Sequence, residues 1–149
     1  MKNNTIKIIC IVIYAIAALS GFGFAGVYLF RPEFMPYHQM AVGQPWEQVP
    51  EGYRILILAL MRVGGGGWLA ASLAMTALLV MPCRKGRYWA YITIPVIGLA
   101  VLLPTFIATL HVEYETPATP PYLFAGIMSI LLLISLGLCL LNRKREKTT

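Results

Sequence analysis

The most unusual charge in the sequence is Arg62, which lies inside an apolar run from Ile55 to Met81. A charge at bilayer depth is costly, so intramembrane arginines usually pair with an acid or bind a ligand. Arg62 is seven residues past Ile55, about 10 Å along a helix, which predicts a position in the outer third of the bilayer. It could pair with Glu113 or Glu33 and hold two spans together. Alternatively, it could bind an anionic headgroup or a carboxylate ligand.

Further polar residues could join Arg62 around a ligand. Thr105, Thr109 and Glu113 are spaced four residues apart and would stack on one helix face if the helix continues that far. His111 stands two residues before Glu113. The sequence therefore predicts a ligand-binding set at the outer mouth of the protein, made of Arg62, Thr105, Thr109, His111 and Glu113.

Two metal hypotheses and one catalytic hypothesis use the same region. His111, Glu113 and Glu115 alternate, so an extended segment would point them the same way, and His38 could complete a divalent-metal site. The M-x-x-H-x-M pattern at residues 35–40 would suit Cu(I). Neither spacing is a known ligand signature, so we expect no metal and no cofactor. No catalytic motif is present in the sequence, although histidine and glutamate from separate helices could act as acid and base.

Composition places these residues in a membrane protein. Of 149 residues, 58% are hydrophobic and 12% are charged, about half the charged fraction of a soluble domain. Four apolar runs are long enough to cross a bilayer. We predict one polytopic domain over residues 1–149, an all-α four-helix transmembrane bundle with spans at about 6–30, 54–81, 88–110 and 122–141. The net charge of +6 is not organised into a basic face with interleaved aromatics, which excludes a nucleic-acid partner.

Positive charges predict the orientation of the bundle. If the chain crosses four times, nine of its 12 lysines and arginines fall on one side. The positive-inside rule places that side, with both termini, in the cytoplasm. These nine residues are Lys2, Lys7, Arg84, Lys85, Arg87, Arg143, Lys144, Arg145 and Lys147.

The two loops on the opposite side would then face outward from the inner (plasma) membrane. They are residues 31–53, a proline-rich loop between the first two spans, and residues 111–121. Four prolines exclude a long helix from the first loop and predict an ordered cap with a short helix at about 40–48. Cys10, Cys83 and Cys139 fall near the cytoplasmic side, so we predict no structural disulfide.

Small residues recur where helices could approach one another closely. The candidate packing positions are Ala17, Gly21 and Ala25 in the first span, and Gly64, Gly65, Gly66, Gly67 and Ala70 in the second. Each glycine lowers helix propensity by about 1 kcal/mol relative to alanine. Four consecutive glycines therefore require a close helix, an irregular turn or a ligand at the backbone. The same faces could also form a homo-oligomer or dock onto a larger membrane complex.

One local pattern has a counterpart in known proteins. Arg62 is followed by Gly64, Gly65, Trp68 and Ala71, within a chain of four predicted spans. This plan resembles small bacterial membrane proteins of the DoxX-like and DUF4345-like kind. The resemblance implies a four-helix bundle and a mostly unassigned function. Some DoxX-like members are linked to membrane-associated redox complexes, but no redox residue of this chain carries that property over.

Three functional hypotheses follow. The leading one is an integral-membrane accessory subunit that uses its small-residue faces to associate with copies of itself or with other proteins. The second is a protein that binds or transports a small amphiphilic or anionic ligand at the outer mouth. The third is a membrane enzyme that uses outer-face histidine and glutamate, although the sequence favours a non-enzymatic role. In each case membrane lipids are the surrounding partners.

Overall fold

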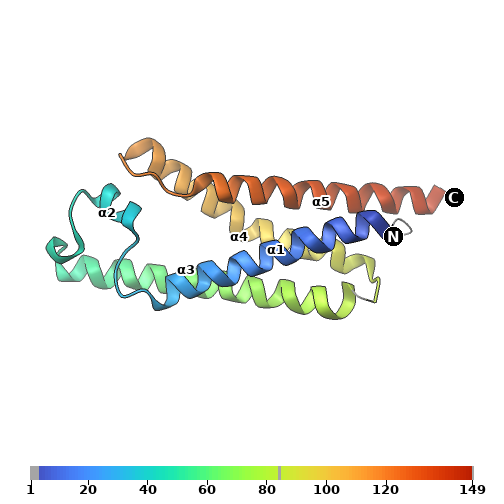
Figure 1. The fold of residues 1–149 in the computed structure, drawn as a ribbon, viewed down its shortest axis with the longest axis horizontal. Helices are drawn as coiled ribbons and strands as arrows, with labels where there is room; N and C mark the ends of the chain where they lie inside the picture. Colours follow the sequence, from blue (N-terminus) through green and yellow to red (C-terminus); the bar gives the residue numbers. More distant parts are fainter. Residues whose placement is uncertain (1–3, 84, 149) are drawn as a thin grey trace.

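Four long helices form the molecule and run side by side along one axis (Figure 1). The computed structural model describes residues 4–83 and 85–148, and side chains as far as residue 143. The long helices are α1 (Asn4–Phe30), α3 (Glu51–Leu78), α4 (Tyr88–Glu115) and α5 (Tyr122–Thr148), and a π-helical turn, η2 (Leu79–Cys83), extends α3. The predicted all-α four-helix bundle is confirmed.

The two ends of the bundle differ in structure. Both termini lie at one end, which we call the terminal end, together with η2 (Figure 1). The opposite, capped end carries α2 (Pro36–Val42) and a 3-10 turn, η1 (Trp46–Gln48). The predicted cap helix at 40–48 is wrong in position. Proline is tolerated in the first turn of a helix, so Pro36 begins α2, and Gly43, with φ of 77°, ends it.

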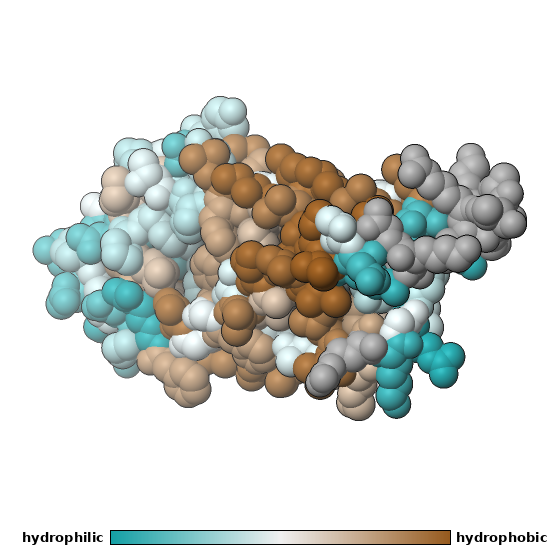
Figure 2. All heavy atoms as spheres, turned by 45° about the vertical axis from the view of Figure 1, so that its right-hand side comes forward, coloured by the Kyte–Doolittle hydropathy of each residue, from teal (hydrophilic) through white to brown (hydrophobic). Residues whose placement is uncertain are grey.

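The surface has the polarity of a protein that crosses a membrane. All four long helices are apolar over a length sufficient to span a bilayer. Figure 2 shows an apolar belt between two hydrophilic ends. Large side chains such as Leu19, Leu60 and Ile107 are exposed within the helices, as expected where lipid replaces water. The chain is therefore a small four-span membrane protein.

Close packing of α1 against α3 depends on two glycines. A Cβ atom added to Gly21 would overlap the Ser72 hydroxyl, and one added to Gly65 would lie 3.1 Å from the backbone nitrogen of Leu29. Gly66 and Gly67 have open surroundings. The glycine run thus has one member that the contact requires. Of the other predicted packing positions, Ala17 and Ala25 are buried, whereas Ala70 is exposed.

These contacts fix the relative level of residues on the two antiparallel helices. Gly65 meets Leu29, so Arg62, three residues earlier on α3, lies level with the end of α1 at Phe30. Measured from Cys83 at the other end, Arg62 is 21 residues away, about 32 Å along the helix. The hydrocarbon core of a bilayer is about 30 Å thick. With Cys83 at one boundary of that core, Arg62 would lie near the other, and its depth in the bilayer stays a prediction.

A buried polar cluster joins the helices at the terminal end. The hydroxyl of Tyr14 on α1 donates to the backbone oxygen of Tyr91 on α4, at 2.7 Å. That carbonyl would normally accept from the residue four positions later, which is Pro95 and has no N–H. Tyr14 thus satisfies the backbone group that the proline leaves unpaired. Cys10 and Cys139 are buried beside it with their sulfurs 3.6 Å apart, and both are free thiols.

Candidate functional site

A partly open cavity of about 270 Å³ lies beneath the cap, between the four long helices and α2. Phenylalanine, tyrosine and tryptophan supply five of its 14 lining residues. Trp68 of α3 stacks on Phe24 of α1 with ring centroids 5.4 Å apart, and the ring of Phe124 of α5 also contacts Phe24, at the same centroid distance. The remaining lining residues are Tyr28, Tyr37, His38, Gly64, Leu102, Thr105, Ala108, Thr109, Val112, Pro121 and Ala125.

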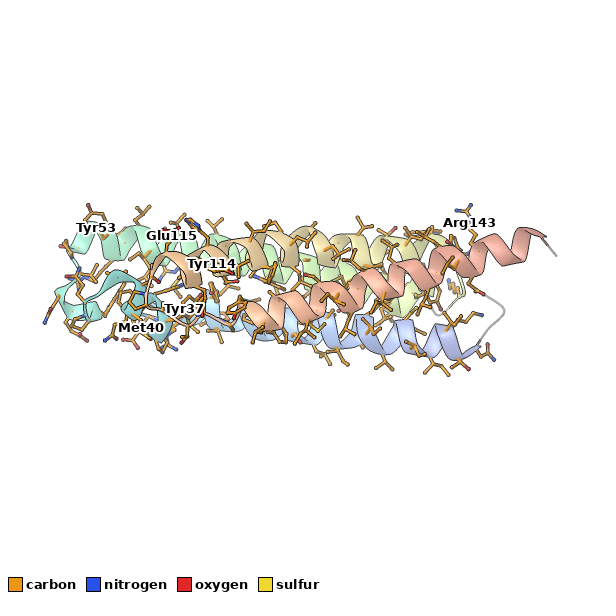
Figure 3. All side chains as sticks on the ribbon, turned by 90° about the horizontal axis from the view of Figure 1, so that it is seen from above. Tyr37, Met40, Tyr53, Tyr114, Glu115 and Arg143 are labelled. Atoms are coloured by element: carbon orange, nitrogen blue, oxygen red, sulfur yellow. The ribbon has the colours of Figure 1, made fainter. Side chains whose placement is uncertain are left out.

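Helix α2 supplies the polar roof of the cavity. Figure 3 shows Tyr37 and Met40 at the same end of the bundle as Tyr114 and Glu115, and far from Arg143. The hydroxyls of Tyr37 and Tyr28 are 2.6 Å apart and hydrogen-bond to each other. One hydroxyl hydrogen serves that bond, so the pair retains a second hydrogen that it can donate to a ligand.

His38 is the second donor of the roof. Its Nδ1 accepts a hydrogen bond from the backbone N–H of Met35, at 3.3 Å. Burial lowers the pKa of His38 below its ordinary value of 6.5, so the ring is neutral at pH 7 and carries its hydrogen on Nε2. Burial also raises the pKa of Tyr37, and its hydrogen bond with Tyr28 acts in the same direction. The roof therefore presents neutral donors.

Two threonines of α4 provide acceptors on the opposite wall. The Thr105 hydroxyl donates to the backbone oxygen of Val101, and the Thr109 hydroxyl donates to that of Thr105, both at 2.8 Å. Because each hydroxyl hydrogen is already used within the helix, only oxygen lone pairs remain for a ligand. The lining contains no lysine, arginine, aspartate or glutamate. The cavity thus combines aromatic walls with a few neutral polar groups.

The predicted ligand-binding set is only partly brought together. Thr105 and Thr109 line the cavity, whereas Arg62, His111 and Glu113 do not. Arg62 and His111 are exposed. Within the described residues, the one ion pair closer than 4 Å joins Arg31 and Glu33, at 3.2 Å, so Arg62 pairs with neither Glu113 nor Glu33.

The alternating acidic and histidine residues are not where the sequence places them. Helix α4 continues to Glu115, so His111, Glu113 and Glu115 are helical and the loop begins at Thr116. Alternate residues of a helix point in different directions, unlike those of a strand. No group of three or more histidine, cysteine or acidic side chains in the described part of the chain could hold a metal ion, and His38 lies in the cavity roof instead.

Sequence reasoning missed most of the cavity. The aromatic residues of the cap and of the spans carried no functional expectation. The glycine run gave no specific signal for the cavity, because a Cβ at Gly64 would lie 4.0 Å from the Tyr28 ring, which is an ordinary contact. Comparisons with protein-family models, curated proteins and solved structures found no match. The resemblance to DoxX-like and DUF4345-like proteins stays a prediction.

Proposed function

We propose that this membrane protein binds a small, uncharged, ring-bearing amphiphile in the cavity beneath its cap. The supporting observation is the combination of aromatic walls with neutral donors and acceptors around about 270 Å³. Ligand pockets are typically apolar with a small number of placed polar groups. At this volume the cavity accommodates one ring with a short substituent.

The polar groups define the preferred head of the ligand. The Tyr28–Tyr37 pair and the His38 Nε2 each have a hydrogen to donate. Acceptor atoms on the ligand, such as carbonyl oxygens, would pair with both donors, and a ligand without acceptors would leave them unpaired at a cost of about 1–3 kcal/mol each. A charged head is disfavoured because no opposite charge lines the cavity. We therefore favour an uncharged ligand over the anionic version of the ligand hypothesis.

The accessory-subunit hypothesis has less support. It relied on small residues available for association, but Gly21, Gly65 and Ala25 pack within the chain itself. Exposed small residues remain at Gly67 and Ala70, and a homo-oligomer or larger complex through that face is compatible with ligand binding. We place the cap on the outer side of the plasma membrane because of the charge asymmetry of the sequence.

Quenching of Trp68 fluorescence tests the proposal. Trp46 and Trp89 are replaced with phenylalanine, and the protein is titrated in mild detergent with ethyl 4-bromobenzoate. This probe is a neutral ring with a carbonyl acceptor and a bromine that quenches tryptophan on close approach. We expect saturable quenching, and about tenfold weaker binding in a Thr109→Phe variant, because the added ring occupies part of the cavity.

The matched control keeps Trp89 as the sole tryptophan, through Trp46→Phe and Trp68→Phe. Trp89 is half exposed near the terminal end, so partitioning of the probe into detergent should quench it without saturation. Linear quenching at Trp68 as well, or saturable binding that Thr109→Phe leaves unchanged, would contradict the proposed function.

A further inference from the structure

The cavity adjoins an open groove between α1 and α5. The groove has a volume of about 370 Å³ and is lined by Ser20, Gly23, Phe24, Val27, Met35 and Phe124. Phe24 and Phe124 line the cavity as well, so the two spaces meet at these rings, which are tilted at 47° to each other. Apart from Ser20 the groove is apolar, so it suits a hydrocarbon chain.

The depth of this groove places its opening in the hydrocarbon region. Gly21 meets Ser72 on the antiparallel α3, so Cys10, eleven residues before Gly21, lies level with Cys83, eleven residues after Ser72, near the terminal end. Gly23 is 13 residues beyond Cys10, about 20 Å along α1. This lies within a hydrocarbon core about 30 Å thick. A chain leaving the cavity past Gly23 would therefore enter lipid directly.

A second apolar groove, between α2 and α3, is a less suitable exit. It shares Tyr28, His38 and Val112 with the cavity and also has a volume of about 370 Å³. Its α3 side is formed by Ile57, Leu60 and Met61. Leu60 is 23 residues from Cys83, about 34 Å along the helix, and thus at or beyond the headgroup boundary. A hydrocarbon chain leaving there would be exposed to water and lipid headgroups.

We propose that the ligand is a lipid with one long hydrocarbon chain, whose neutral ring-bearing head occupies the cavity and whose chain leaves between α1 and α5. This inference rests on the proposed function and adds the class of ligand and its route. The head then pairs with the cap and α4 while the chain remains in the membrane. The ligand can consequently enter and leave from the side without passing through water.

Chain length and groove blocking together test the route. The Trp68-only protein is titrated with the ethyl and the hexadecyl ester of 4-bromobenzoate. Gly23→Phe places a ring in the groove, and a Cβ at Gly23 has nothing within 4 Å, so the variant should fold. We expect Gly23→Phe to lower the affinity for the hexadecyl ester about tenfold and to leave the affinity for the ethyl ester unchanged.

Two variants serve as matched controls. Gly26 is on the same helix with equally open surroundings and does not line the groove, so Gly26→Phe should leave the ratio of the two affinities unchanged. Ala41→Phe blocks the α2–α3 groove and should also leave it unchanged. The route would be overturned if Ala41→Phe changed the ratio of the two affinities, or if Gly23→Phe lowered the affinity for both esters equally. Either result would leave the proposed function intact. Absence of saturable binding by either ester to the unblocked protein would overturn both.

Discussion

Replacing Gly65 with alanine should destabilise the protein by about 1–3 kcal/mol, because the added methyl group overpacks the contact between α1 and α3. The new Cβ would lie 2.9 Å from Leu29 Cγ, 3.0 Å from Tyr28 Cβ and 3.1 Å from the Leu29 backbone nitrogen. Side chains can rotate away, but the backbone of α1 can yield only if the two helices separate. Reversible unfolding in mixed micelles of mild detergent and SDS measures the effect.

The neighbouring glycines are matched controls within one helical turn. A Cβ at Gly66 or Gly67 has nothing within 4 Å, so Gly66→Ala and Gly67→Ala should leave the free energy of unfolding unchanged or raise it by up to about 1 kcal/mol through helix propensity. Equal effects at all three positions would show that helix propensity, and not close packing of α1 on α3, governs this run.

The second large effect is expected at Tyr14, which supplies the hydrogen bond that Pro95 denies to the Tyr91 carbonyl. Tyr14→Phe keeps the ring in the core but removes the donor. Tyr14 is fully buried, so the carbonyl would be left unpaired in an apolar environment, at a cost of about 1–3 kcal/mol. The same unfolding measurement in mixed micelles detects this loss.

A double-mutant cycle isolates the relation between tyrosine and proline. Pro95→Ala restores a backbone N–H that can bond to the Tyr91 carbonyl within α4. In that background Tyr14→Phe should cost much less than it does alone, giving a coupling energy of about 1 kcal/mol or more. Additive effects would mean that Tyr14 contributes through ring packing and not through the carbonyl that Pro95 leaves free.

The sequence was sufficient for the architecture. Apolar runs of membrane-spanning length require helices, since a bilayer offers no other partner for backbone polar groups. The rows of small residues indicated close helix contacts, and Gly21 and Gly65 lie at such a contact. The sequence could not predict which glycine of the run is required. Consecutive residues point in different directions around a helix axis, so the rotation of α3 about its own axis decides which glycine faces α1.

The site was less accessible to sequence reasoning. Thr105 and Thr109 were found through their helical spacing. Arg62 was included as a charge within an apolar run and His111 as a histidine close to Glu113, but the sequence does not show where each helix ends. Helix α4 runs five residues beyond the predicted span, and Arg62 lies level with the end of α1. The roof formed by Tyr37 and His38 depends on the cap folding back over the bundle, a long-range contact that leaves no periodic signal.

The most direct measurement of the central claim is a native mass spectrum of the protein extracted from its own membrane in mild detergent, recorded beside the Thr109→Phe variant. We expect one stoichiometric, uncharged molecule bound to the protein, with its amount much reduced in the variant. A protein that carries no small molecule in either form, or one whose bound molecule is unaffected by filling the cavity, would contradict it.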